Sequence, residues 1–333
     1  YPVYQKKIIK DKNRDDVDVS KCLNKYDRLF FFKRNKKLYE DITELYSLNK
    51  FDVIFAYSLF SNGYLAYNIK KKHGIPYIVI IQNTDINLYF NKMLHLRNVG
   101  RKILHNASYI IFISEAYKEY LLKNYVAKHE RSEIIKKSYV IPFGIDNFWF
   151  ENKIHNKKKN KDKIKLLYVG KINRNKNILA SIKACKSLID MGQNLSFTVV
   201  GEIQNRRLAK KIMKNKFVYY VPFSEKNDLL NIYRDNDIFI MPSKKETFGL
   251  VYAEAMSQGL PVIYSKGQGF DKQFKEGTVG HRVEPNNING IVDSILKIYE
   301  HYEDYTNRCT YAVEKFRWKN IIGKYKFILE QIK

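Results

Sequence analysis

The fold is decided by the stretch Asp237-Ile-Phe-Ile-Met-Pro-Ser-Lys-Lys-Glu246-Thr-Phe-Gly-Leu-Val-Tyr-Ala-Glu254-Ala-Met-Ser-Gln-Gly259-Leu-Pro-Val-Ile-Tyr264. Its short apolar run at 238–241 is bounded by Pro242 and predicts a strand buried on both faces of a parallel sheet. A helix is predicted from Leu250 to Gly259, because apolar residues recur along one side of it and glycine is typical of a helix C-terminus. A second buried strand follows at 260–264. The stretch therefore predicts a βαβ unit.

The loop between this strand and this helix has the features of an anion site. Glu246 lies in the loop and residues 247–249 lead into the helix, so free backbone N–H groups should point into the crevice at the end of the strand. Glu254 lies one turn past Leu250 and can border the same crevice. Two carboxylates beside an anion site would accept hydroxyls next to phosphates, and a nucleotide sugar has both groups. The alternative is that both glutamates are solvated surface residues.

The same stretch resembles the Glu-x7-Glu signature of the retaining glycosyltransferases of family 4 (group 1), which have the GT-B fold. The resemblance covers about residues 50–333. It implies that Glu246 contacts the donor sugar, that Glu254 contacts the ribose hydroxyls, and that the amides after the first glutamate hold the donor diphosphate. The donor-binding residues implied in that segment are Thr247, Phe248, Gly249 and Leu250.

Length and composition restrict the class of protein. The chain has 333 residues, enough for two domains of about 150 residues each. Its hydrophobic content of 45% excludes a disordered chain, and no apolar run approaches the roughly 20 residues of a membrane-spanning helix. The three cysteines are widely spaced and indicate neither a disulfide framework nor a zinc cluster, so we expect a cytoplasmic protein. The net charge of +26 suits nucleic acid, anionic lipid or a phosphorylated substrate.

The first 150 residues alternate between strand and helix patterns. Strands are predicted at residues 28–32, 52–57, 76–81, 107–114 and 139–146, and helices at residues 36–46, 58–72 and 115–123. This alternation indicates a parallel, doubly wound sheet, and we expect the first strand of the domain to be missing.

The segment Gln82-Asn-Thr-Asp85 follows one of these strands, at the position where open α/β sheets bind ligands. It resembles the His-Gly-Thr-Asp segment of the family, with Gln82 in place of the histidine. The resemblance implies that Gln82 donates a hydrogen bond to the donor sugar, whereas a group that titrates near neutral pH is lost.

Residues 88–107 interleave apolar side chains with basic ones, among them Arg97, Arg101 and Lys102. One interpretation is an amphipathic helix that covers the sheet. The other is a helix that lies in the plane of an anionic membrane, held by its apolar groups and basic flanks.

The second half begins after a Lys- and Asn-rich stretch at residues 151–163, which has no periodicity and predicts an exposed linker. A strand at 164–170 leads into a loop and then into a helix at 176–191. The loop resembles the Gly-Arg-x4-Lys segment of the family, which implies that Gly170, Lys171 and Lys176 lie at the donor diphosphate. Lysine supplies charge there without the bidentate geometry of arginine. Further strands are predicted at 195–201 and 217–222, and further helices at 225–234, 288–303 and 318–332.

These features predict a GT-B fold, with two facing Rossmann-like domains, a cleft between them and a C-terminal helix that crosses back to the first domain. The predicted boundaries are 1–150 for an acceptor domain, 151–163 for the linker, 164–316 for a nucleotide-sugar domain and 317–333 for the crossing helix. The predicted function is retaining, metal-independent hexosyl transfer in cell-surface polysaccharide synthesis, with Glu246, Lys176 and Gln82 as the catalytic residues.

The expected partners are a nucleotide-sugar donor, a glycan or lipid-linked acceptor, and an anionic membrane contacted peripherally from the cytoplasmic side. No cofactor or metal ion is expected, because Asp235-Asn-Asp237 precedes a buried strand and indicates a helix end. Nucleic acid is not expected, because the aromatic residues fall in buried-strand patterns. Two alternatives remain open: a nucleotide-sugar epimerase or phosphorylase on the same fold, and a basic nucleic-acid-binding protein.

Overall fold

The computed structural model describes residue 18, residues 20–154 and residues 156–332, and the chain forms two compact units. Unit 1 comprises residues 1–111 and 122–139 with the last two residues of the chain, and unit 2 comprises residues 112–121 and 140–331. The predicted lack of a first strand falls at the start of the chain, outside the described residues, and stays a prediction.

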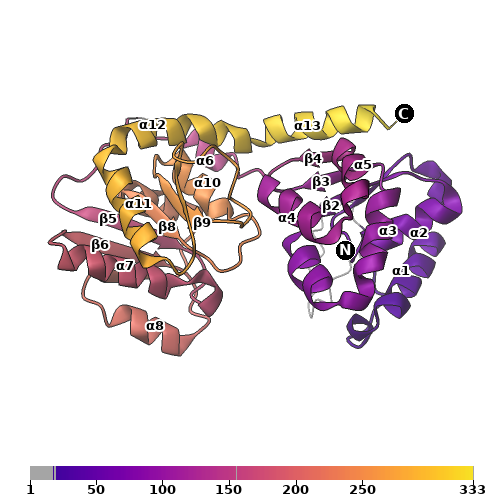
Figure 1. Cartoon of the computed structure of the whole chain (residues 1–333), viewed down its shortest axis with the longest axis horizontal. Helices are drawn as coiled ribbons and strands as arrows, with labels where there is room; N and C mark the ends of the chain where they lie inside the picture. Colours follow the sequence, from indigo (N-terminus) through magenta and orange to yellow (C-terminus); the bar gives the residue numbers. More distant parts are fainter. Residues whose placement is uncertain (1–17, 19, 155, 333) are drawn as a thin grey trace. The chain divides into compact units, whose positions relative to one another are not determined.

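Unit 1 contains a four-stranded sheet in the order β1-β2-β3-β4 (Figure 1). Its strands are β1 (Ile54–Ala56), β2 (Tyr77–Ile81), β3 (Tyr109–Phe112) and β4 (Ser138–Val140). The accompanying helices are α1 (Phe31–Leu45), α2 (Gly63–His73), α3 (Arg97–Asn106) and α5 (Arg131–Lys136), whereas α4 (Glu115–Tyr125) begins in unit 2 and ends in unit 1. β1 and β2 run parallel, and all five residues of β2 are buried. Burial of every residue is typical of a strand that is covered on both faces.

Unit 1 has a helix where the sequence predicts a strand. The prediction of a strand at residues 28–32 is wrong, because α1 starts at Phe31. Leu38 of α1 is fully buried in one cluster with Leu65 of α2. The ring of Phe31 packs 5.2 Å from the ring of Tyr64, also on α2. Three consecutive phenylalanines imitate a buried strand, but the helical spacing of the residues after them gives α1 an apolar side that packs on α2.

The prediction of one continuous helix at residues 88–107 is also wrong. The segment contains a π-helical turn (Asp85–Phe90), a 3-10 turn (Leu94–Leu96) and α3. Arg97 stabilises the break, since its Nε donates a hydrogen bond to the carbonyl oxygen of Phe90 at 2.8 Å. Ile103 and Leu104 of α3 are buried. The apolar side of α3 therefore packs inside unit 1, as the first of the two interpretations expects.

Unit 2 contains a six-stranded sheet in the order β10-β9-β8-β5-β6-β7, in which neighbouring strands run parallel. Its strands are β5 (Ile164–Val169), β6 (Leu195–Val200), β7 (Val218–Val221), β8 (Ile238–Met241), β9 (Val262–Ser265) and β10 (Gly280–Val283). The sheet grows outward from β5 in one direction and from β8 in the other. The order reverses between these two strands, where Leu166 pairs with Ile238. Open α/β sheets bind ligands outside the strand ends at such a switch point.

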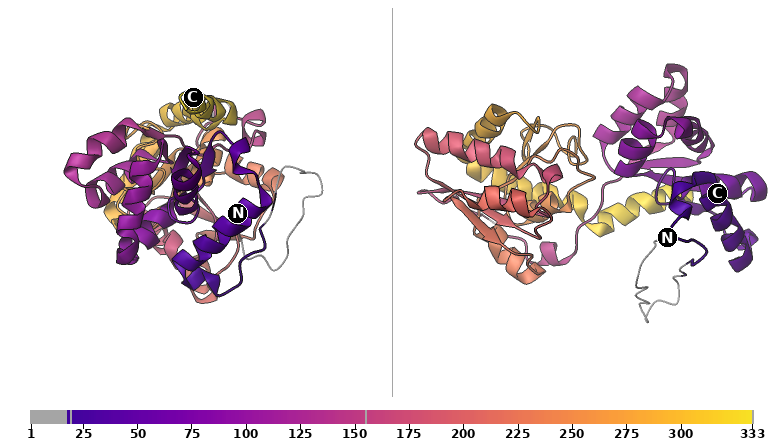
Figure 2. Two further views of the ribbon diagram at one scale, coloured as in Figure 1. Left: turned by 90° about the vertical axis from the view of Figure 1, so that its right-hand side faces the viewer. Right: turned by 90° about the horizontal axis from the view of Figure 1, so that it is seen from below.

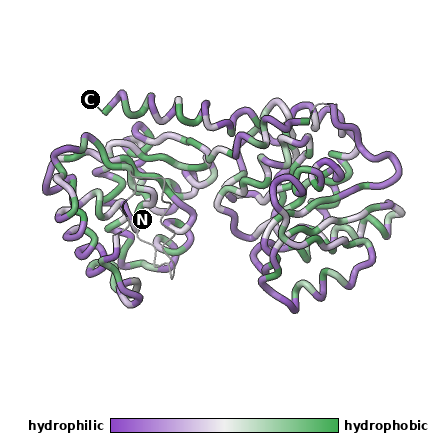
Figure 3. The backbone as a smooth tube through the Cα atoms, turned by 180° about the vertical axis from the view of Figure 1, so that it is seen from behind, coloured by the Kyte–Doolittle hydropathy of each residue, from purple (hydrophilic) through white to green (hydrophobic). Residues whose placement is uncertain are grey.

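Helices cover both faces of this sheet (Figure 2). The helices of unit 2 are α6 (Phe148–Glu151), α7 (Ile178–Asp190), α8 (Arg206–Met213), α9 (Lys226–Arg234), α10 (Leu250–Ser257), α11 (Ile288–Glu300) and α12 (Tyr302–Ala312). α13 (Trp318–Glu330) follows them and contacts the short turn Val313–Phe316. α7 packs against α8 and α11, whereas α10 packs against α6 and α12. When the backbone is coloured by hydropathy, hydrophobic residues lie in the interior of unit 2, where its strands are (Figure 3). β10, α6, α8 and α12 have no counterpart among the strands and helices predicted from the sequence.

The Lys- and Asn-rich segment 151–163 is not the exposed linker that its composition predicts. Lys157 is only 7% exposed, and its Nζ donates a hydrogen bond to the carbonyl oxygen of Tyr233 at 2.9 Å. The backbone N–H of Asn160 donates to Asp237, immediately before β8, at 3.2 Å. Burial lowers the pKa of Lys157 to about 7. The long apolar stem of lysine explains why a basic segment can pack on unit 2 in this way.

Candidate functional site

Two loops flank the switch point of unit 2, and both carry predicted site residues. The loop after β5 contains Lys171 and Lys176, and the loop after β8 contains Glu246. Because β5 and β8 are parallel neighbours, their loops leave the sheet at the same edge. Residues that are far apart in the sequence are thereby brought together.

Hydrogen bonds join the two loops directly. The backbone N–H of Lys244 donates to the carbonyl oxygen of Asn175 at 2.8 Å, and the backbone N–H of Lys245 donates to the Asn175 side chain at 3.1 Å. The Asn175 amide donates back to the Lys245 carbonyl oxygen at 2.8 Å. Asn173 accepts hydrogen bonds from the backbone N–H groups of Asn175 and Lys176. The sequence analysis missed both asparagines, although asparagine is typical of such turns.

Lys176 and Glu246 form an ion pair between these loops. The Lys176 Nζ lies 2.6 Å from Oε2 of Glu246, and the Ser243 hydroxyl donates to the same oxygen at 3.4 Å. The side chains are 20% and 11% exposed, respectively. A mostly buried pair of this kind is expensive to break, because removing one partner leaves an uncompensated charge. The pair therefore holds a cation and a carboxylate at fixed positions beside the switch point.

The N-terminus of α10 lies at the end of the same loop. Gly249 precedes α10 with φ +80°, and a Cβ there would lie 2.5 Å from the ring of Tyr252, so only glycine fits. No side chain caps this N-terminus and its first turn has no acidic residue. Helix geometry leaves the amides of Leu250 and Val251 without intrahelical partners. These amides and the helix dipole favour an anion at this position.

Glu254 lies on α10 and is half-buried. The Tyr233 hydroxyl donates a hydrogen bond to its Oε2 at 3.2 Å. Burial raises the pKa of Glu254 to about 7, while the hydrogen bond from Tyr233 acts in the opposite direction. Ionised, this carboxylate accepts hydrogen bonds from hydroxyl groups.

Two other residues predicted to bind the donor, Lys171 and Phe248, differ in how far their side chains are exposed. Lys171 is exposed, and its carbonyl oxygen accepts a hydrogen bond from Tyr168 at 2.9 Å. Phe248 is buried, and its ring packs 5.5 Å from that of Phe316. Any contact of Phe248 with a donor must then use its backbone.

Backbones approach closely at two further positions of this edge. A Cβ on Gly201 would lie 2.2 Å from the carbonyl oxygen of Gly170, and a Cβ on Gly269 would lie 1.7 Å from that of Thr247. Glycine at 201 and 269 is therefore required to pack the loop ends together.

Gln82 lies in unit 1, directly after β2, whereas Lys176 and Glu246 lie in unit 2. Its backbone N–H donates to the carboxylate of Asp85 at 2.8 Å. The same buried carboxylate accepts from the backbone N–H groups of Leu59 at 2.9 Å and Phe60 at 3.0 Å. Burial raises the pKa of Asp85 to about 6, whereas the three hydrogen bonds act to lower this pKa. This role of Asp85 was not predicted from the sequence. The available signal is an acidic residue four positions after the end of a strand, within reach of the backbone N–H of the residue that follows the strand.

In the part of the chain that the structure describes, no group of three or more His, Cys, Asp or Glu side chains could hold a metal ion. Within the same residues, none of the helices combines the length and the hydropathy of a membrane-spanning segment.

Two α/β units with parallel sheets are the architecture of the GT-B glycosyltransferases, and unit 2 carries the Lys176–Glu246 pair and the N-terminus of α10 at its switch point. A solved structure of Anabaena Alr3699/HepE in complex with UDP and glucose has this fold: it is 15% identical, with a TM-score of 0.63, and covers 94% of this chain and 85% of that one.

The chain belongs to the family of glycosyl transferases group 1, whose model matches residues 150–316, and residues 11–146 match the model of glycosyltransferase family 4. An uncharacterized glycosyltransferase of Methanocaldococcus jannaschii is 28% identical over 324 residues, which are 90% of this chain and 79% of that protein. The capsular polysaccharide biosynthesis glycosyltransferase CapM of Staphylococcus aureus is 26% identical over 203 residues, which are 58% of this chain and 52% of CapM.

Proposed function

We propose that this protein transfers a hexose-type sugar, with retention, from a nucleotide-sugar donor to a glycan or lipid-linked acceptor in the synthesis of a cell-surface polysaccharide. The observation that carries the proposal is the Lys176–Glu246 pair, at 2.6 Å, at the switch point of unit 2 beside the uncapped N-terminus of α10. A diphosphate requires positive charge and N–H donors, and a sugar requires a carboxylate that accepts from its hydroxyls.

In this proposal the donor diphosphate binds the amides of Leu250 and Val251 together with Lys176, helped by Lys171. Glu246 accepts from hydroxyls of the transferred sugar, and Glu254 accepts from the ribose hydroxyls. The hydrogen bonds between the two loops fix Lys176 before the donor arrives, so little reorganisation is needed during the reaction.

The bond between the acceptor oxygen and C1 of the sugar forms on the face from which the diphosphate leaves. The bond between C1 and the phosphate oxygen breaks, and the acceptor hydroxyl gives its proton to the departing phosphate. In this proposal Glu246, which accepts hydrogen bonds from Lys176 and Ser243, contacts the sugar and is not the nucleophile. The task of the protein is then to position both substrates and to stabilise the negative charge that develops on the diphosphate.

The names of similar proteins support the choice of substrates. The Anabaena protein binds UDP and glucose, and CapM is named for capsular polysaccharide synthesis. A nucleotide-sugar epimerase or phosphorylase on the same fold is the rival activity.

The test is a panel of UDP- and GDP-sugars, assayed for release of the free nucleotide diphosphate with and without candidate acceptors, in the presence of EDTA. We expect release that depends on acceptor and persists in EDTA, because Lys176 and the α10 amides supply the positive charge. NMR of the product should show the anomeric configuration of the donor. Acceptor-independent isomerisation would favour the epimerase, and a strict need for a divalent ion would contradict the metal-independent mechanism.

We also propose contact with a membrane, but through the start of α1 and not through the segment 88–107. Arg97 and Arg101 donate to carbonyl oxygens within unit 1, so they hold the fold. Large apolar side chains are exposed instead at the start of α1, where Phe30 is 58% and Phe32 is 53% exposed beside Lys33. Exposed aromatic residues with a basic neighbour suit an anionic lipid surface.

We expect the protein to sediment with phosphatidylglycerol vesicles, and the double variant Phe30→Ser/Phe32→Ser to lose most of this binding. The double variant Phe51→Ser/Tyr311→Ser is the matched control, because it removes exposed aromatic area elsewhere. Equal binding by the two double variants would rule out this surface.

A further inference from the structure

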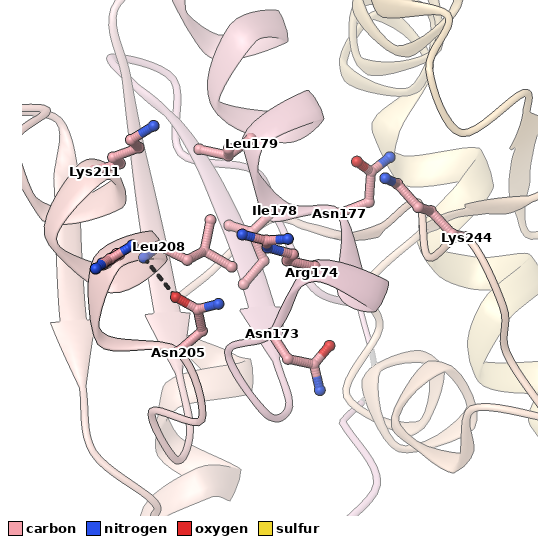
Figure 4. Close-up of a pocket in the computed structure, with 10 residues that line it drawn as sticks. Asn173, Arg174, Asn177, Ile178, Leu179, Asn205, Leu208, Lys211 and Lys244 are labelled. Carbon is pink, nitrogen blue, oxygen red and sulfur yellow. Dashed lines mark hydrogen bonds between the residues drawn. The ribbon is translucent and has the colours of Figure 1, made fainter.

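A cavity of about 420 Å³ lies in unit 2 between the loop after β5, the start of α7 and helix α8 (Figure 4). It is lined by Asn173, Arg174, Asn177, Ile178, Leu179, Asn205, Arg207, Leu208, Lys211 and Lys244. Arg174 lies between Asn205 on one side and Lys244 on the other (Figure 4). This volume falls in the range of about 300–1,000 Å³ that is usual for small-ligand pockets.

The lining has four cations and no acidic residue. They are Arg174, Arg207, Lys211 and Lys244. Across the described ranges, none of these four side chains makes a salt bridge of 4.0 Å or less. The neighbouring Lys176, in contrast, is paired with Glu246. Cations that line one concavity repel one another, and the field they create there attracts an anion.

Helix α8 adds to this positive potential. Its first turn carries Arg206 and Arg207 and has no acidic residue. Asn205 satisfies one backbone N–H, that of Leu208, at 3.0 Å. Arginine at the N-terminus faces the positive end of the helix dipole, which is unfavourable unless an anion lies between them. The charge pattern of α8 therefore favours the same kind of ligand as the cavity lining.

The cavity is separate from the proposed diphosphate site. One short turn, Arg174–Lys176, carries Arg174 into the cavity and Lys176 to Glu246. Neither Lys176 nor Glu246 lines the cavity, and the N-terminus of α10 does not line it either. An anion held here would contact a different set of donors from those proposed for the sugar nucleotide.

We propose that this cavity is a second anion site, which binds a phosphate group by contacts with Arg174, Arg207, Lys211 and Lys244. The phosphate belongs either to a free phosphorylated small molecule or to a lipid headgroup. This inference goes beyond the proposed transferase activity and does not depend on it, since binding at the cavity is measured without donor or acceptor.

The test is calorimetric titration of the whole protein with inorganic pyrophosphate at physiological ionic strength. Because pyrophosphate also suits the proposed diphosphate site, the titration is made in the Lys176→Ala background, where adding Arg174→Gln/Arg207→Gln/Lys211→Gln is expected to weaken binding at least about tenfold, or about 1.4 kcal/mol. These three substitutions remove three of the four cations that line the cavity. The control is Lys210→Gln/Lys214→Gln/Lys216→Gln, which removes the same charge from exposed positions on and after α8 and should keep the affinity within about twofold. Circular dichroism checks that both variants fold.

A second arm separates the two sites. Lys176→Ala should retain pyrophosphate binding at the cavity. Unchanged affinity in the cavity variant, an equal loss in the control, or loss of all binding in Lys176→Ala would each overturn the proposal.

A third arm identifies the source of the phosphate. Vesicles of phosphatidylcholine with phosphatidic acid compete with pyrophosphate if the ligand is a lipid headgroup. Vesicles that fail to compete, while pyrophosphate still binds, assign the cavity to a free phosphorylated molecule. Both outcomes support the cavity as the phosphate site.

Discussion

Replacing Lys176 with alanine is expected to lower turnover by a factor on the order of a hundred to a thousand, which is typical for the loss of one preorganised charge at a developing anion. The Nζ of Lys176 is fixed by its 2.6 Å contact with Glu246 and by the turn that Asn173 caps. In the proposed reaction this charge stabilises the departing diphosphate. Lys171, which is exposed, should be less important, and Lys171→Ala should cost less.

The measurement is kcat with a saturating donor, together with a melting curve for each variant. Lys186→Ala is the matched control, because Lys186 is exposed on α7, the helix that follows the same loop. It should keep full activity. Full activity in Lys176→Ala would show that the phosphate site lies elsewhere.

Removing Lys176 alone leaves the carboxylate of Glu246 mostly buried and unpaired, which could lower stability and so obscure the result. The double variant Lys176→Met/Glu246→Gln removes both charges and keeps the shapes of the side chains. We expect it to melt near the temperature of the unmodified protein and to remain inactive. Recovery of activity in the double variant would indicate that the loss in Lys176→Ala came from the unpaired carboxylate.

Replacing each of the two glutamates, Glu246 and Glu254, should change a different kinetic parameter. Glu246→Ala should chiefly lower kcat, because Glu246 is proposed to contact the sugar whose bond breaks. Glu254→Ala should chiefly raise the donor KM, by roughly ten- to a hundredfold, since charged hydrogen bonds contribute roughly 1.5–3 kcal/mol. Glu300→Ala, at an exposed position, is the control. Equal losses of kcat and of donor affinity in both site variants would count against these assignments.

The pH dependence gives a second measurement for Glu254. Burial raises its pKa to about 7, so the carboxyl gains a proton as the pH falls through neutrality. A neutral carboxyl is a weaker acceptor for ribose hydroxyls, so the donor KM should rise as the pH is lowered from about 8 to about 6. Both phosphates of a nucleotide sugar are diesters and keep their charge in this interval. Glu254→Gln cannot titrate, and its donor KM should stay flat. A similar slope in Glu254→Gln would assign the titration to another group.

Much of unit 2 could be predicted from local sequence. The strand, loop, helix and strand expected at residues 237–264 are confirmed as β8, α10 and β9. The short apolar runs determine the strands locally, and Pro242 and Gly259 mark where elements end. These signals extend over a few residues, so the elements can be predicted without the rest of the chain. The GT-B fold, predicted by resemblance, is also confirmed. The assignment of Glu246, Lys176 and Gln82 to catalysis stays a prediction.

Unit 1 was harder to predict because local signals conflicted with packing. Three phenylalanines in succession have a high strand propensity, yet α1 forms there because Leu38 and its neighbours bury one helical face against α2. Likewise, the periodicity of residues 88–107 does not show the break that Arg97 stabilises through the Phe90 carbonyl. In the first case a contact between two helices outweighs the intrinsic preference, and in the second a hydrogen bond between residues seven positions apart does so.

The residue types of the proposed site can be read from the sequence: a basic loop follows one strand, and a glutamate precedes a helix after another. The contact between Lys176 and Glu246, 70 positions apart, depends instead on the three-dimensional arrangement. The reason is the strand order, which places β5 beside β8 and so brings their loops to one edge. Arg174, two residues before Lys176, lines a cavity together with cations of α8 and of the loop after β8. Strand order depends on packing across the whole sheet, which no local stretch of sequence encodes.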